Sequence, residues 1–152
     1  MTTQSRGPFL QAALLCERAL REKDDVLSII RIVDRWHVGM PPRKPEDPPY
    51  AATIPATGVI MLKSGDYKGK KMLGLKIVAP DGVVSDLAGM PLLFEGDERG
   101  VNVVMTVNIQ AQKEGLYWID VYLDDDLQTR IAFRIMFEYV ITSSGASEQQ
   151  RP

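Results

Sequence analysis

The sequence predicts an all-β fold from three observations. Residues 115–137 contain two runs in which apolar and polar side chains alternate with a period of two, as in half-buried strands. Further short apolar runs follow one another, separated by turns rich in Gly, Pro and Asp. The chain has 152 residues, 45% of them hydrophobic, which suits one domain with a sizeable core. Together these features predict an antiparallel β-sandwich of immunoglobulin-like type with about seven to eight strands.

The N-terminal segment 9–22 has two interpretations. Its Ala, Leu, Glu and Arg content favours a helix. However, residues 26–36 are rich in β-branched side chains and follow a polar turn, Lys23-Asp24-Asp25, as a second strand would. Because the two segments are similar in length, we predict a β-hairpin, and a helix over residues 9–22 is the alternative.

The middle of the chain reads as a loop followed by four short strands. Residues 41–56 hold six of the ten prolines, which lack an N–H donor and disfavour helix before them, so an extended surface loop is expected. Turn residues then separate runs of strand-forming residues at three points: Ser64-Gly65-Asp66, Pro80-Asp81-Gly82 and Glu95-Gly96-Asp97. The predicted strands are Gly58–Lys63, Lys70–Ala79, Met90–Phe94 and Val101–Ile109.

The clearest hairpin is the run GLYWIDVYLDDDLQTRIAFRIMF, residues 115–137, with its acidic turn. Alternation places one set of side chains of each strand on a buried face and the other set on the opposite face. With the strand at 101–109, this hairpin predicts a shared core. Its expected members are Ile119, Val121, Phe133, Ile135, Val103, Met105 and Val107.

The sequence is therefore divided into three parts. Residues 1–8 are polar and are expected to be a flexible N-terminus, and residues 9–141 are expected to form the β-sandwich domain. Residues 142–152 lack apolar periodicity and predict a disordered tail.

Charge and cysteine content limit the classes of partner. The net charge of −2, from 18 basic and 20 acidic residues, gives no broad positive field for nucleic acid or for an anionic membrane. Cys16 is the only cysteine, so no internal disulfide can form, and the N-terminal apolar patch is a poor signal peptide. We therefore expect a cytoplasmic protein without nucleic-acid or membrane partners.

The N-terminal hairpin also carries a resemblance. Its features are Leu15-Cys16-Glu17 at the end of an apolar strand, the turn Lys23-Asp24-Asp25, and a strand beginning Leu27-Ser28-Ile29-Ile30. This pattern resembles the opening of a bacterial family of uncharacterised β-sandwich proteins, a domain of unknown function, over residues 10–35. The resemblance implies a compact β-sandwich and brings no known activity or catalytic residues.

The residues that could carry catalysis are few. His37 is the only histidine, and a Cys16–His37 pair is conceivable if the first two strands are neighbours. An unpaired cysteine in an apolar run is more often a small core residue, because a reactive thiol needs access and a depressed pKa. Residues 65–71 share Gly and Lys content with a phosphate-binding loop but not its spacing. The sequence therefore predicts a protein that is not an enzyme and holds no cofactor.

The acidic turn is the one place where a metal ion could be considered. Asp124, Asp125 and Asp126 are the candidate calcium ligands, with Asp120 a few residues earlier. Calcium needs about six to eight oxygen ligands, and Asp is favoured in turns for its local backbone hydrogen bonds. We therefore favour a solvated turn and expect no metal.

The aromatic residues give the main functional hypothesis. Leu116, Trp118 and Tyr122 lie on the face opposite the predicted core, and Asp120 interrupts them. This face is either covered by residues 41–56 or exposed to a partner, since large apolar patches and Trp or Tyr side chains are typical of interfaces.

The predicted function is a non-enzymatic protein-interaction module that binds a protein partner or a second copy. Its tentative interaction residues are Leu116, Trp118, Tyr122 and Trp36, and a sheet edge is the other possible contact. The alternative function is a small-ligand or carbohydrate-binding β-sandwich in which Trp36, Tyr50 and Trp118 form stacking platforms.

Overall fold

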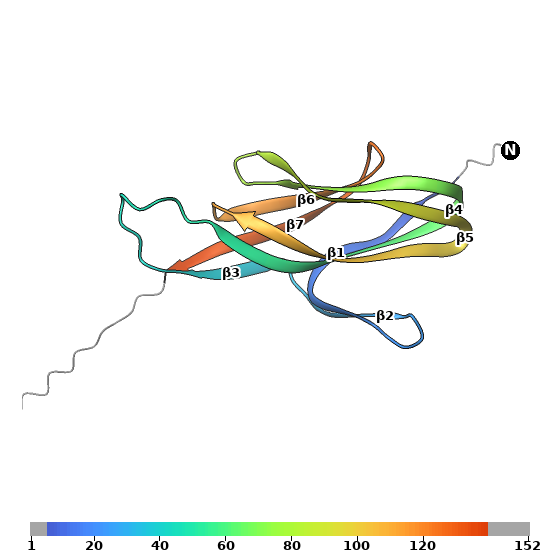
Figure 1. Cartoon of the computed structure of the whole chain (residues 1–152), viewed down its shortest axis with the longest axis horizontal. Helices are drawn as coiled ribbons and strands as arrows, with labels where there is room; N and C mark the ends of the chain where they lie inside the picture. The colour runs from blue at the N-terminus through green and yellow to red at the C-terminus, as the bar shows by residue number, and fades with distance from the viewer. Residues whose placement is uncertain (1–5, 140–152) are drawn as a thin grey trace, which may run out of the picture.

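The computed structural model describes residues 6–139, and this part of the chain is all-β, with no helix (Figure 1). The all-β prediction is confirmed, and so is the choice of a strand over a helix for residues 9–22. The seven strands are β1 (Phe9–Arg21), β2 (Leu27–Ile32), β3 (Arg35–Met40), β4 (Ala52–Val78), β5 (Val84–Ala111), β6 (Gly115–Leu123) and β7 (Asp126–Tyr139). Residues 1–5 and the predicted tail at 142–152 lie outside the described residues.

The strands form one sheet in the order β2-β1-β4-β6-β7-β3, with β5 paired to β4. All the pairings are antiparallel except that of β3 with β7, in which Arg35 pairs with Arg134 in parallel. The sheet is mixed, so the prediction of a purely antiparallel arrangement is wrong at this point. The reason is that β3 and β7 are far apart in the chain, and no hairpin turn sets their relative direction.

The segment 26–36, predicted as one strand, contains β2 and the start of β3. Strand β2 pairs with β1, and β3 pairs with β7. The chain leaves β2 after Ile32, and the N–H of Val33 donates to the carbonyl of Leu15 at 2.9 Å. One residue later, the carbonyl of Asp34 accepts from the N–H of Arg134 at 2.8 Å. Residues 33–34 therefore transfer the chain from β1 to β7, and the strand that follows ends at Met40, immediately before the predicted loop.

The sequence predicted four short strands in the middle of the chain, whereas the structure has two long ones, β4 and β5. They pair from Ala52↔Ala111 to Val78↔Val84. The prediction of turns at 64–66 and 95–97 is wrong, because these segments lie opposite each other, with Gly65 paired to Asp97. Gly65 has a φ of 59°, and a Cβ there would lie 2.3 Å from the carbonyl oxygen of Arg6, so only glycine fits. These residues bend a continuous ladder instead of ending it.

The predicted loop at 41–56 is also too long. Residues 52–56 are the start of β4 and pair with the end of β5, so only residues 41–51 connect β3 to β4. Proline content alone did not reveal this, because β4 contains Pro55 in its ladder opposite Asn108.

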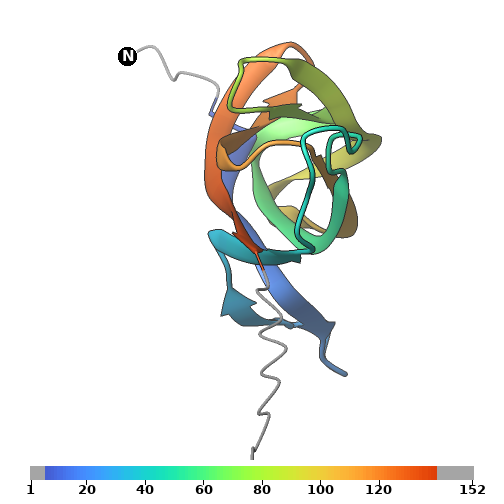
Figure 2. The same cartoon turned by 90° about the vertical axis from the view of Figure 1, so that its left-hand side faces the viewer.

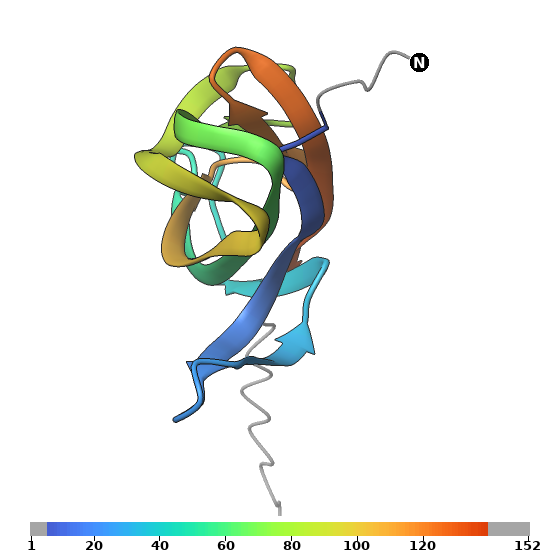
Figure 3. The same ribbon diagram turned by 90° about the vertical axis from the view of Figure 1, so that its right-hand side faces the viewer.

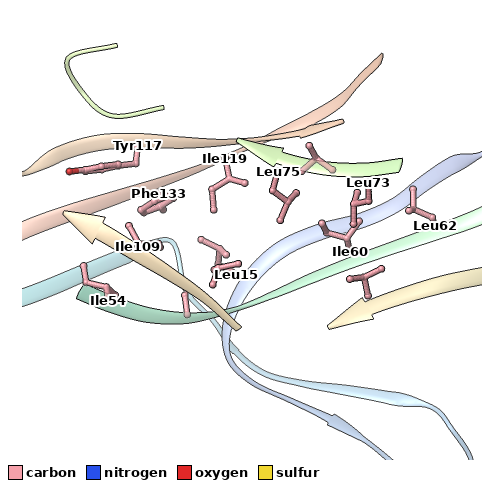
Figure 4. Packing of buried hydrophobic residues seen from close by; sticks show 14 of the residues in the cluster. Leu15, Ile54, Ile60, Leu62, Leu73, Leu75, Ile109, Tyr117, Ile119 and Phe133 are labelled. Carbon is pink, nitrogen blue, oxygen red and sulfur yellow. The ribbon is translucent and has the colours of Figure 1, made fainter. Parts of the chain in front are cut away.

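The bend in β4 and β5 folds the sheet around one core. The first half of β4 pairs with β1 and the second half pairs with β6, so the two halves face each other across the core. Figure 4 shows Leu73 and Leu75 of the second half pointing toward Ile60 of the first half and Leu15 of β1. Figure 2 shows the strands curving around the interior of the molecule. Of the predicted core, Ile119, Val121, Phe133, Ile135, Val103 and Val107 are buried, and Met105 is half-buried against them.

Over residues 6–139, the structure has no helix with the length and apolar character needed to cross a membrane.

Candidate functional site

The Trp118 face, defined as Leu116, Trp118, Asp120 and Tyr122, lies on the outer side of β6. The alternation is as predicted, because Tyr117, Ile119 and Val121 are buried on the inner side. On the outer side Trp118 and Tyr122 are half-buried and Leu116 is exposed. The structure therefore places the three predicted residues of β6 on one face, between β4 and β7.

Cationic side chains from the neighbouring strands cover the aromatic rings of the Trp118 face. The Arg130 guanidinium lies 4.7 Å from the ring centroid of Trp118, and the Lys76 ammonium lies 5.6 Å from that of Tyr122. Arg130 Nε also donates to Asp120 Oδ1 at 2.6 Å. Because the long stems of Lys and Arg cover apolar surface while their charges stay in water, this face is less apolar than its sequence indicates.

The other two aromatic candidates lie elsewhere. Trp36 pairs with Ile135 of β7 and packs its ring edge-on against the buried Phe133, with centroids 5.5 Å apart. Trp36 is thus on the core side of the sheet, opposite Trp118. Tyr50 lies in the 41–51 connection, where its hydroxyl donates to the carbonyl of Pro41. The structure does not bring Trp36, Tyr50 and Trp118 together into one stacking platform.

The β1–β2 arm, residues 17–32, is a surface whose shape the sequence did not show. Strand β1 pairs with β4 only as far as Cys16↔Thr57, and beyond this pair it continues with β2 alone. Pro55 lies two residues before Thr57 on β4, where an antiparallel ladder with β1 would continue. It has no N–H to donate to such a ladder. Figures 1 and 3 show the resulting two-stranded arm projecting from the body of the molecule.

The arm exposes large apolar side chains. Ile32 is 67% exposed and Val26 is 57% exposed, and Leu20 and Ile30 are also exposed. In the sheet order of the described residues, β2 is a terminal strand, with β1 on one side and no strand on the other. Both features are typical of surfaces that contact another protein.

The end cavity is a hollow of about 300 Å³ where the turn between β4 and β5 meets the turn between β5 and β6. The Lys113 ammonium donates to Asp81 Oδ2 at 2.9 Å and joins the two turns. This hydrogen bond lowers the pKa of Asp81, and burial raises the pKa of Tyr117 at the inner wall. The cavity is lined by Ile77, Ala79, Asp81, Val83, Ser85, Gln110, Gln112, Lys113 and Tyr117. Sequence reasoning missed it because its two turns are distant in the chain.

The two residues considered for nucleophilic catalysis have other surroundings. Cys16 is buried on β1 between Ile32 and Thr57, and burial raises the pKa of its thiol, which disfavours the reactive thiolate. His37 is on β3, and its Nδ1 lies 2.7 Å from Glu138 Oε1 at the surface. Cys16 and His37 thus lie on different strands with different partners, and they do not form the pair considered from the sequence.

The acidic turn has a structural contact. Asp124 Oδ1 accepts from the N–H of Met72 at 2.9 Å, which fastens the hairpin tip to β4, and this bond lowers the pKa of the carboxyl. Asp125 completes the turn, and Asp126 begins β7. Within the described range 6–139, no three His, Cys, Asp or Glu side chains are grouped so that they could hold a metal ion.

Comparisons with known proteins give limited likenesses. No protein-family model matches the chain, and no curated protein matches it in sequence. Among solved structures, β-glucosidase 3B from Thermotoga neapolitana, in complex with glucose, aligns with a TM-score of 0.41 and 16% identity over 54% of this chain and 14% of its own. The Pseudomonas fluorescens alkylpurine DNA glycosylase AlkC, bound to DNA, aligns with a TM-score of 0.38 and 11% identity over 68% of this chain and 27% of its own. Likenesses of this extent carry no inference about the fold or the function of this chain.

Proposed function

We propose that the protein is a non-enzymatic interaction module whose β1–β2 arm pairs with an extended segment of a protein partner. The observation that carries this proposal is that the arm leaves the body with large apolar side chains exposed on it. An isolated two-stranded hairpin is marginal in water, whereas a third strand would bury its apolar side chains and pair its open edge.

The open edge of β2 favours a short contact. Residues 27–30 contain neither Pro nor Lys, the residues that commonly protect edge strands. Arg31 has a φ of 55°, which interrupts the extended backbone after Ile30. The partner segment would therefore add as a strand along residues 27–30 and cover Ile30 with apolar side chains of its own.

The Trp118 face is the rival surface for the same function. Its rings are covered by Arg130 and Lys76, and Asp120 is paired with Arg130. These contacts are satisfied within one molecule, so a partner would gain less apolar burial there than on the arm. The proposal includes no nucleic-acid or membrane binding, which the balanced charge supports, and it keeps the expectations of a cytoplasmic location and of no cofactor.

The test compares substitutions on the two surfaces. Ile30→Lys places a charge on the open edge, Trp118→Ala removes the ring of the rival face, and Leu127→Lys is the matched control at an exposed apolar position of β7. Circular dichroism and melting temperature show which variants fold. Each folded variant is used to capture proteins from the native host, and self-association is measured by analytical ultracentrifugation.

The proposal expects one binding event, to a partner or to a second copy, that Ile30→Lys abolishes and the other two variants retain. Binding that Trp118→Ala abolishes and Ile30→Lys retains would assign the function to the Trp118 face. The absence of any binding sensitive to Ile30→Lys would overturn the proposal for the arm.

A second candidate function, binding of a small ligand, is favoured by the end cavity and not by an aromatic platform.

The proposal for the finer architecture is an immunoglobulin-like variant of the β-sandwich. It is supported by the two halves of β4, which face each other across the core. Membership of the bacterial family of uncharacterised β-sandwich proteins stays a prediction.

A further inference from the structure

We infer that the end cavity binds one ring of a neutral sugar. This inference rests on the second function proposed above, and it names the site and the ligand class. The cavity volume of about 300 Å³ lies at the small end of the range for ligand pockets, roughly 300–1,000 Å³, so it suits one ring and not a chain of them.

The lining of the cavity combines the two kinds of surface that a sugar ring presents. Ile77 and Val83 provide aliphatic surface for the C–H groups of a ring. Ser85, Gln110 and Gln112 provide a hydroxyl and two carboxamides. A carboxamide both donates and accepts hydrogen bonds, as a sugar hydroxyl does, so these groups can pair with either role of each hydroxyl.

The charges in the lining select against an ionic ligand. Asp81 and Lys113 are the charged residues of the lining, and they are bonded to each other at 2.9 Å. A carboxylate or phosphate would have to compete with Asp81 for the lysine, and a cation would have to compete with Lys113 for the carboxylate. A neutral polyhydroxy ligand can accept and donate hydrogen bonds at the pair without separating it.

The walls of the cavity are held in place before a ligand arrives. A Cβ on Gly115 would lie 3.0 Å from Pro80 Cγ, so the two turns pack directly against each other. The Tyr117 hydroxyl donates to the carbonyl of Lys113, and Thr53 Oγ1 donates to Gln110 Oε1 at 3.1 Å. This second bond restrains the Gln110 carboxamide. Such preorganisation lowers the entropy cost of binding.

The test is a titration of the ¹⁵N-labelled chain of 152 residues, followed through its backbone amide resonances. The probes are D-glucose, D-galactose, D-mannose, cellotriose and gluconate, each added at millimolar concentrations. At least one neutral monosaccharide is expected to shift amides in residues 77–85 and 110–117 and to leave the β1–β2 arm unaffected. Equal affinities for cellotriose and glucose would indicate that the ligand is a free monosaccharide. A much higher affinity for cellotriose would indicate that the ligand is the end of a sugar chain.

Variants then locate the binding groups. Gln112→Ala and Ser85→Ala each remove a polar group of the lining and are expected to weaken binding roughly five- to tenfold, the loss of about one hydrogen bond. The matched control is Gln11→Ala, an exposed glutamine on β1 that does not line the cavity, and it should bind as the unaltered chain does. Equal affinity in all three variants would overturn the inference.

The remaining outcomes separate this inference from the function on which it rests. Shifts in the cavity residues with gluconate alone would overturn the neutral class but keep small-ligand binding at this site. Shifts confined to another surface would overturn the cavity as the site. The absence of shifts in the cavity residues with all five probes would overturn the inference of a sugar site, and would not by itself bear on the second proposed function.

Discussion

Arg130 and Asp120 face each other in register on β7 and β6, and Arg130 Nε donates to Asp120 Oδ1 at 2.6 Å. The Asp120 side chain is only 13% exposed, and the Arg130 guanidinium that binds it also lies 4.7 Å from the ring centroid of Trp118. The pair explains why a carboxylate can interrupt the aromatic side of β6. It is stabilised by a charge-assisted hydrogen bond, and the same arginine covers the neighbouring indole.

Replacing Arg130 by glutamine is expected to lower the free energy of unfolding by about 1–3 kcal/mol, because the largely buried Asp120 loses its charged partner. Urea denaturation measures the change. The control is Arg134→Gln, on the same strand and exposed, which should stay within about 0.5 kcal/mol of the unaltered protein. Equal effects of the two substitutions would contradict a specific role for the pair.

Replacing Phe133 by alanine is expected to cost about 3–5 kcal/mol, from lost burial and the cavity left behind. Phe133 is 1% exposed, and its ring stacks on Tyr117 with centroids 5.3 Å apart. Leu127→Ala, at a position that is 49% exposed, is the control and should have a much smaller effect. A loss near zero for Phe133→Ala, again measured by denaturation, would contradict the assignment of the core face.

Asp124→Ala is expected to destabilise the protein in a pH-dependent way, and Asp125→Ala is its neighbour control. The pKa of Asp124 is lowered in the folded chain, mainly by the hydrogen bond from the N–H of Met72. The ionised carboxylate therefore adds stability at pH values above its ordinary pKa of 3.8, and this stability is lost as the pH falls through the lower folded value. Thermal unfolding at neutral and acidic pH should show a difference at pH 7 that shrinks in acid. A difference that stays constant would contradict this role of Asp124.

A chelator is expected to leave the melting temperature unchanged, and added calcium is expected not to raise it. A ligand that binds only the folded state must raise the stability of that state, so the melting temperature reports directly on a metal site. A clear calcium-dependent rise would identify the turn at 124–126 as a site after all, and Asp125→Ala, which spares the hydrogen bond to Met72, should then abolish the rise.

The sequence predicted the hairpin of β6 and β7 well because its pattern is local. Alternation fixes which side chains are buried, and an acidic turn between the runs sets the register. The same reasoning split β4 and β5 into four strands, since Gly65 and Gly96 have the chemistry of turns. Local residue types do not distinguish a chain reversal from a bend in a continuous ladder, because both need positive φ angles.

The candidate surfaces were predictable to the extent that they lie on one strand. Trp118 and Tyr122 share a face because they are four residues apart on β6, and this follows from the period of two. The Lys76 that lies over Tyr122 comes from β4, and Asp81 and Lys113 of the end cavity come from separate turns. Such arrangements depend on how distant strands pair, which a single sequence does not encode in any local pattern.

The pairing of β4 with β5 also has a kinetic consequence. Val78 pairs with Val84 beside a short turn. Once this pair has formed, each next pair closes only a small additional loop, and the last pair is Ala52 with Ala111. This hairpin can therefore close progressively from its turn at 79–83, at a small entropy cost per step. The parallel pairing of β3 with β7 requires nearly the whole chain to be present first, since Arg35 pairs with Arg134. We expect β3 to dock late in folding, when the ring of Trp36 meets Phe133 and completes the core.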